Sequence, residues 1–268
     1  MTAPSPSPTP QRGFTVPVDL TNPGQFFACC GLLEVADRLY GHAEGWFEGD
    51  TFHVACSGTL PDLLQKLAKA ELTATDPDNT TACPLELHLP THILRLDWWT
   101  DQFAGGAELK TWAGSMDGYR IAQAMQRSLI RPDAYPDPFN SGTVCRAGDS
   151  DDDKKVEPFY FDARRAGSSD ARDIGFSPND LQRGLETIAY PAVEFLTLVG
   201  LQRFRPAPGD GPRLFLYATW AVPLPAPAAQ TVVQGIPNTL IRRRYLFENW
   251  FRTSQRKHKA FRRAQRIQ

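Results

Sequence analysis

The sequence lacks an apolar run approaching the roughly 20 residues that a membrane-spanning helix needs. It does not open with a charged segment followed by an apolar one, as a secretion signal does. It has no CxxC pair, and its five cysteines are an odd number, which disfavours a disulfide framework. We therefore expect a soluble, cytoplasmic protein with free thiols. Cys29 and Cys30 fall inside an apolar run, where cysteine acts as a small hydrophobic residue.

Signatures of catalysis are also missing, since the chain has neither a P-loop nor a GxGxxG motif after a strand. His53 and Cys56 have an HxxC spacing, but a structural zinc site normally shows two tight ligand pairs. The carboxylate-rich run at 149–153 lies in a low-complexity loop. Three aspartates between 162 and 173 alternate with arginines that would neutralise a metal site. We predict no catalytic residues, no metal ligands and no cofactor.

The composition indicates one large body with many short elements. Of the 268 residues, 41% are hydrophobic, enough for a sizeable core, while 23 prolines and 20 glycines favour irregular loops. Predicted helices and strands are interspersed without a regular βαβ period, so we expect an α+β fold with short antiparallel sheets. The predicted divisions are a disordered Pro/Ser-rich tail (1–13), an α+β body (14–222), a Pro/Ala-rich connector (223–240) and a basic helix (241–268).

The best-specified helix begins near residue 22. Asn22 is a favourable N-cap, Pro23 suits the first helical position, and Gly41 ends the apolar pattern. Asn22 and Gln25 make an approximate capping box. One interpretation is a well-capped core helix. The other interpretation is a binding site, in which Asn22, Gly24 and Gln25 offer amide groups at the positive end of the helix to a phosphate or to the edge of a base.

Periodicity predicts the remaining elements. They are a strand at 14–20, a hairpin at 46–54, helices at 59–72, 116–130 and 191–201, and strands at 85–89, 93–96, 159–161 and 213–220.

Charge is strongly segregated along the chain. Residues 242–268 contain ten Lys/Arg and one acid, a net charge of +9, so the rest carries −10. Aromatic residues interleave the bases, and the planar guanidinium fork suits phosphate. This pattern predicts a polyanion partner. The alternatives are a solvated tail or pairing with the acidic body. The candidate residues here are Arg242, Arg243, Arg244, Arg252, Arg256, Lys257, Lys259, Arg262 and Arg263.

Two smaller candidate patches lie inside the body. Arg164, Arg165 and Arg172 occur in a long polar loop, where they either contact nucleic acid or pair with neighbouring aspartates. Lys110 and Trp112 lie between glycine-bearing turns, where they either contact a nucleic-acid backbone and stack on a base or form an ordinary packed tryptophan beside a surface lysine.

Several stretches in order resemble one protein family. They are VDLTNPGQFFACCGLLEVADRLYG, LDWW followed by LKTWAG, and FDARRAGSSDARDIGFSPNDL followed by YPAVEFLTLVGLQRFRP. Together they resemble CRISPR-associated proteins of subtype I-U/I-G systems, a short version of the Cascade large subunit. The resemblance covers most of residues 14–222. The basic C-terminus has no match, and the helical C-terminal bundle usual in large subunits is missing or reduced to it.

The resemblance implies a non-catalytic subunit of an RNA-guided surveillance complex in antiviral defence. Such a subunit binds guide RNA and double-stranded target DNA, contributes to protospacer-adjacent-motif recognition and contacts the backbone and guide-end-capping subunits. A helicase-nuclease recruited in trans then acts on the DNA. In such complexes the protein reads the short motif while guide pairing reads the sequence. The alternatives are a metal-dependent nuclease and an assembly subunit that makes only protein contacts.

Overall fold

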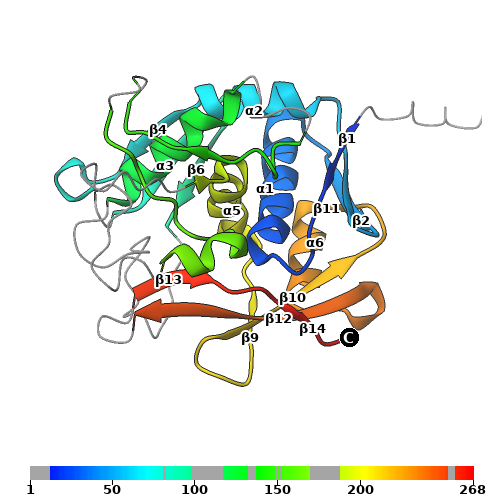
Figure 1. Cartoon of the computed structure of the whole chain (residues 1–268). Coiled ribbons are helices and arrows are strands. Elements are labelled where there is room, and N and C mark those ends of the chain that lie inside the picture. The colour runs from blue at the N-terminus through cyan, green and yellow to red at the C-terminus, as the bar shows by residue number, and fades with distance from the viewer. Residues whose placement is uncertain are drawn as a thin grey trace, which may run out of the picture.

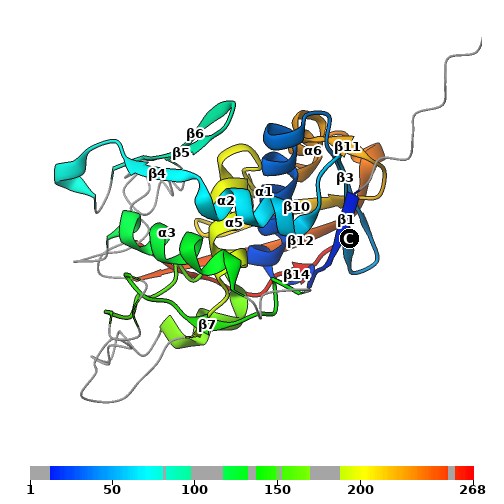
Figure 2. The ribbon, with the colours of Figure 1, turned by 90° about the horizontal axis from the view of Figure 1, so that it is seen from above.

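Two buried helices form the centre of the molecule, and short antiparallel sheets surround them (Figure 1 and, from above, Figure 2). The computed structural model describes residues 13–80, 83–97, 117–131, 137–148, 150, 153–169, 188–252 and 257–268. The central helices are α1 (Pro23–Tyr40) and α5 (Pro191–Arg203). The predicted α+β class with short antiparallel sheets is confirmed.

The other elements follow one another along the chain in short segments. In chain order they are β1 (Gly13–Pro17), β2 (Glu44–Glu48), β3 (Thr51–Ala55), α2 (Leu60–Lys69), β4 (Glu71–Ala74), η1 (Pro77–Asn79), β5 (Leu85–Leu89), β6 (His92–Leu96), α3 (Gly118–Arg127), η3 (Ser128–Ile130), β7 (Thr143–Val144), η5 (Ala163–Ser169), β8 (Ile188–Ala189), β9 (Ala207–Pro208), β10 (Leu214–Trp220), β11 (Leu224–Pro225), α6 (Ala226–Val233), η7 (Asn238–Leu240), β12 (Ile241–Arg252), β13 (Lys257–Phe261) and β14 (Gln265–Arg266). None of these described helices is long and apolar enough to span a bilayer.

Helices α1 and α5 approach so closely that only glycine fits at the crossing. A Cβ at Gly31 would lie 2.1 Å from the Leu196 carbonyl oxygen, and one at Gly200 would lie 2.2 Å from that of Phe27. Thr197 also donates its hydroxyl to the Gly24 carbonyl at 2.7 Å. The backbones of the two helices are therefore in direct contact at this crossing, with no room for a side chain between them.

The start of α1 follows most of its sequence signals. Asn22 is the N-cap and accepts from the Gly24 amide at 3.1 Å, with Pro23 in the first turn. The capping box is wrong, because Gln25 Oε1 accepts from the Asp19 amide at 2.7 Å. As a charged residue, Glu34 is expected on the solvent-facing side of this helix. It is instead buried and paired with Arg38 and Arg203, so it ties α1 to α5.

Most elements of the body lie where the periodicity placed them. The predicted hairpin is β2–β3, in which Phe47 pairs with Phe52, and β1 adds to its outer edge. Asp117 is the N-cap of α3 and its side chain accepts from the Arg120 amide, and the 3₁₀ segment η3 directly follows this helix. No strand forms at 159–161. These residues are buried all the same, and Phe159 stacks on Phe161.

The predicted C-terminal basic helix is wrong, because residues 241–268 form strands. Strand β12 pairs with β10, β13 and β14, and so completes the sheet beneath the helices in Figure 1. Tyr245 and Phe247 alternate into the core, and Phe261 is fully buried. The aromatic residues of this segment favour a pleated, half-buried surface, and their burial outweighs the helical preference of the interleaved arginines.

The predicted connector at 223–240 is also wrong as a separate segment. It contains α6, whose Ala226, Ala229 and Val232 are fully buried in the same core as α1. The core extends from Val16 to Ala264 and is continuous. The boundaries predicted at 222 and 240 therefore do not separate domains.

Candidate nucleic-acid interface

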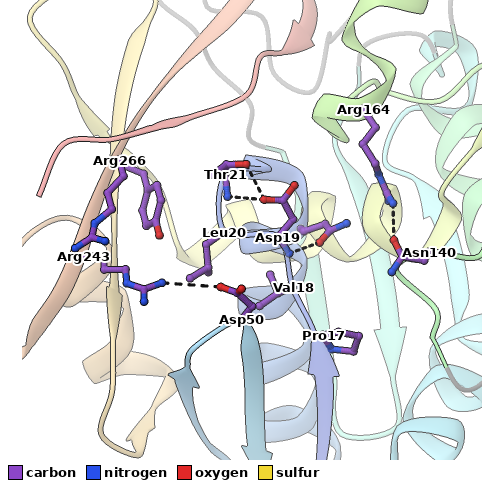
Figure 3. A pocket seen from close by; sticks show the side chains of 12 residues that line it. Pro17, Val18, Asp19, Leu20, Thr21, Asp50, Asn140, Arg164, Arg243 and Arg266 are labelled. Atoms are coloured by element: carbon purple, nitrogen blue, oxygen red, sulfur yellow. Dashed lines mark hydrogen bonds and ion pairs between the residues drawn. The ribbon is translucent and has the colours of Figure 1, made fainter.

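A hollow of about 610 Å³ lies where the C-terminal sheet meets the segment that leads into α1 (Figure 3). Arginines lie on two sides of it: Arg243 and Arg266 on one, and Arg164 with Asn140 on the other. The segment 17–21 runs between them, and Asp50 lies at the β2–β3 turn. We call this hollow the arginine pocket. Its size is within the usual range for a site that holds a small ligand.

Strand register brings the arginines of the C-terminal segment together. Tyr245 lies directly opposite Arg266 in the β12–β14 pair, and Arg243 lies two residues before Tyr245. Residues two apart on a strand share a face, as do residues directly opposite. All three side chains therefore line the arginine pocket, with the Tyr245 ring buried against Tyr217 at 5.2 Å between centroids. Helical spacing would have placed Arg243 and Tyr245 on different faces.

The neighbouring Arg263 fastens the C-terminal chain to the start of α1. Its Nη1 donates to Asp19 Oδ2 at 2.8 Å and to Thr21 Oγ1 at 2.9 Å, and the Ala264 amide donates to the Thr21 carbonyl at 2.7 Å. Partial burial raises the pKa of Asp19, but the hydrogen bonds from Thr21 and Arg263 outweigh it and lower this pKa below its ordinary value. The Asp19 carboxylate therefore stays ionised and paired.

Arg164 is largely occupied by the protein itself. It donates to both oxygens of the buried Asp162, to Asn140 Oδ1 and to the Phe139 carbonyl, and its guanidinium lies 3.5 Å from the centroid of the Tyr190 ring. The alternative expectation, pairing with a neighbouring aspartate, is thus confirmed for this residue. In Arg165, the backbone amide bonds to Asp162, while Nε is buried and has no hydrogen-bond partner among the described residues.

The amides at the start of α1 are internal rather than exposed, which corrects the second interpretation of this helix end. Asn22 is fully buried, accepts from the Gly24 and Ala163 amides, and donates to Asp162 at 2.8 Å. A Cβ at Gly24 would lie 2.4 Å from the Phe161 carbonyl oxygen. Gln25 lines the pocket but is only 3% exposed, and its side-chain oxygen accepts from the Asp19 amide. The polar groups of these residues are therefore used inside the protein.

Beneath this layer, Glu194 of α5 holds the same loop from inside. Its side-chain carboxyl oxygens accept from the Phe161 amide at 3.2 Å and the Asp162 amide at 3.0 Å. Burial raises the pKa of Glu194 to about 8, with a further contribution from the charge of Asp162, despite those hydrogen bonds. Asn22, Asp162 and Glu194 therefore form a buried polar cluster that positions Arg164.

The remaining described arginines lie around the edges of the sheet. Arg242 is exposed and lines a second hollow of about 370 Å³ that also contacts Arg243. Arg244 donates to Asn238 Oδ1. Arg262 pairs with Glu248 at 3.1 Å and lies 3.9 Å over the Trp250 ring.

The other candidates fall where the structure gives no side-chain position. Lys110, Trp112, Arg172 and Arg256 lie outside the described residues, and Arg252, Lys257 and Lys259 are described only by their backbone in β12 and β13.

Three charged residues that line the pocket were not among the site candidates: Arg266, Asp19 and Asp50. Arg266 could have been found by charge alone, because it is one of the ten Lys/Arg of the basic segment, but its position opposite Tyr245 depends on the β12–β14 register. Asp50 looked like an ordinary turn residue after Gly49, and no local pattern connects it to Arg243, which lies 193 residues later in the chain.

No described group of three or more His, Cys, Asp or Glu side chains could hold a metal ion. All five cysteines are free, as predicted, and all five are buried. Burial raises the pKa of Cys29 and Cys30 well above the ordinary thiol value. A comparison of the chain with protein-family models, curated proteins and solved structures found no match.

Proposed function

We propose that this protein is a non-catalytic, cytoplasmic subunit of a type I CRISPR surveillance complex that binds guide RNA and target DNA. The family resemblance of residues 14–222 suggests the complex. The observation that carries the binding role is the arginine pocket, where Arg243 and Arg266 face a common hollow. Guanidinium groups around a concave surface attract a phosphate backbone and hold it by charge-assisted hydrogen bonds.

Arg243 and Arg266 support this role because neither guanidinium forms a hydrogen-bonded ion pair with an acidic side chain of the described residues. Arg243 Nη1 lies 3.9 Å from Asp50 Oδ1, beyond hydrogen-bond distance. Arg266 donates only its Nε, to the Gln268 carbonyl, among the interactions of the described residues. The guanidinium of Arg164, by contrast, donates hydrogen bonds to Asp162, Asn140 and Phe139. The proposed phosphate ligands are therefore Arg243 and Arg266, while Arg164 shapes the wall.

In the complex, the partners would be guide RNA, double-stranded target DNA, the backbone and guide-end-capping subunits, and a helicase-nuclease that joins in trans. A contribution to protospacer-adjacent-motif recognition remains part of the proposal. It does not rest on Asn22, Gly24 or Gln25, because their polar groups are used inside the protein. The second hollow beside Arg242 is the accessible alternative for such contacts.

The test compares the double variant Arg243→Ala/Arg266→Ala with Arg120→Ala, which removes an exposed arginine on α3. Each lost charged hydrogen bond is worth about 1.5–3 kcal/mol, so each pocket substitution should weaken binding about tenfold or more. Fluorescence anisotropy with labelled RNA and duplex DNA measures this. Equal affinities for the double variant and Arg120→Ala would refute the role of the pocket.

Membership of the complex needs a separate experiment. Co-expression with the backbone and guide-end-capping subunits and a guide RNA should yield one co-purifying particle that contains this chain. If the other subunits assemble and this chain stays outside, the CRISPR proposal is wrong. If the chain joins the particle but crosslinks to neither RNA nor DNA, it is an assembly subunit that makes protein contacts alone.

A further inference from the structure

The arginine pocket contains exposed negative charge as well as positive charge. Asp50 lies in the same hollow as Arg243, and its side chain is 85% exposed. A carboxylate repels phosphate, so a site built for phosphate groups alone gains nothing from one at this position. A ligand that carries both an anionic group and a hydrogen-bond donor matches Arg243 and Asp50, since the guanidinium attracts the anion and the carboxylate accepts the hydrogen bond.

Asp50 is held in place by its backbone. Its carbonyl accepts from the Val18 amide at 2.9 Å, which fastens the β2–β3 turn to the segment before α1. The turn is tight, with Gly49 at a φ of +58°. The Asp50 backbone is therefore held at the pocket edge while its carboxylate remains solvated, and an incoming hydroxyl does not have to break a strong internal bond.

The distance between the Arg243 guanidinium and the Asp50 carboxylate suits two neighbouring groups of one nucleotide, its phosphate and its 2′-hydroxyl. Arg243 Nη1 and Asp50 Oδ1 are 3.9 Å apart, too far for a direct hydrogen bond yet close enough for adjacent ligand groups to contact both. In RNA, a 2′-hydroxyl donor lies near a phosphate in every nucleotide, whatever the base. Acidic side chains accept from the ribose 2′-hydroxyl in other nucleotide sites, and this hydroxyl is what distinguishes RNA from DNA.

We propose that the arginine pocket binds a ribonucleotide of single-stranded RNA in preference to DNA. Arg243 and Arg266 bind the phosphate, and the Asp50 carboxylate accepts from the ribose 2′-hydroxyl. Tyr245 closes the inner wall between the two arginines. The inference rests on the proposed function, because it assigns the guide RNA, rather than the target DNA, to this one site.

The experiment measures binding of the full chain to a 12-nucleotide single-stranded RNA and to DNA of the same sequence. We expect the wild type to bind the RNA about tenfold more tightly, the value of one charge-assisted hydrogen bond. Asp50→Ala should lower RNA affinity to about the DNA level and leave DNA affinity unchanged or slightly higher, because it removes a repulsive charge. Asp210→Ala, an exposed acid outside the pocket, should behave as the wild type.

The outcomes separate the two proposals. Equal binding of RNA and DNA by the wild type, or an unchanged RNA/DNA ratio in Asp50→Ala, overturns the ribose assignment and leaves the proposed nucleic-acid role standing. A preference that follows base identity rather than sugar also overturns it. If the wild type and Asp210→Ala bind neither nucleic acid, both proposals fail. Circular dichroism establishes that each variant is folded.

Discussion

Replacing Asn22 by alanine tests whether the start of α1 is a structural junction or a ligand site. The Asn22 oxygen accepts from the Gly24 and Ala163 amides, and its nitrogen donates to Asp162. Loss of an N-cap costs about 0.5–2 kcal/mol. Leaving the buried Ala163 amide without a partner costs about 1–3 kcal/mol more. We expect Asn22→Ala to lose roughly 2–4 kcal/mol of unfolding free energy.

The loss should be visible as a drop in melting temperature. For a chain of this size, 1 kcal/mol corresponds to about 2–4 °C, so Asn22→Ala should melt roughly 5–15 °C lower. The matched control is Thr59→Ala, which removes the exposed N-cap of α2, where Thr59 Oγ1 accepts from the Asp62 amide at 3.3 Å. This bond joins two residues of the same helix end, so its removal should cost about 1 kcal/mol or less of unfolding free energy.

The binding assay completes the experiment. At a temperature where Asn22→Ala is folded, its RNA and DNA affinities should equal those of the wild type. A variant that melts within about 2 °C of the wild type but binds nucleic acid tenfold more weakly would refute the structural assignment. It would restore the interpretation of Asn22 as a direct ligand.

Two further predictions concern the helix pair and the buried carboxylate. Gly200→Ala should lower the unfolding free energy by about 1–3 kcal/mol or more in urea denaturation, because its Cβ meets the Phe27 carbonyl. Gly211→Ala, which meets only the side chain of Leu214, should cost less; equal costs would contradict the close crossing. The pKa of Glu194 is raised to about 8, so the native state keeps a proton that the unfolded state releases above its ordinary pKa of 4.5. Wild-type stability should therefore fall from pH 5 to 8, with a shallower slope in Glu194→Gln, and identical slopes would count against the raised pKa.

The sequence was sufficient for elements whose local signals agree with their burial. In α1, the cap at Asn22, the proline after it and the apolar face all indicate one helix, and the structure has it. The β2–β3 hairpin likewise follows from alternation about a Gly-Asp turn. Where local propensity and tertiary context agree, periodicity is a reliable guide to secondary structure.

The helix predicted for the C-terminal segment (241–268) was wrong because two sequence patterns compete there. Arginine and lysine have good helix propensity, while Tyr245, Phe247 and Phe251 favour a strand. Pairing with β10 decides the outcome, and β10 lies more than twenty residues earlier in the chain. A second strand pairing, between β12 and β14, places Arg266 opposite Tyr245 and so helps to form the arginine pocket. The charge of the segment predicted arginines as candidate ligands, but which of them share a face depends on strand register.

When the basic segment (242–268) folds onto the acidic body, fewer of its positive charges remain available to bind a polyanion. As an isolated +9 segment it could engage about six phosphates, with log K falling against log salt at a slope near −5. In the structure, Arg262 and Arg263 are paired with Glu248 and Asp19, which leaves Arg242, Arg243, Arg244 and Arg266 among the described arginines. Three or four phosphate contacts give a slope of about −3. A slope near −5 would mean that these ion pairs open on binding or that side chains from 252–259 add contacts, whereas a slope near −3 indicates that the folded pairs persist in the complex.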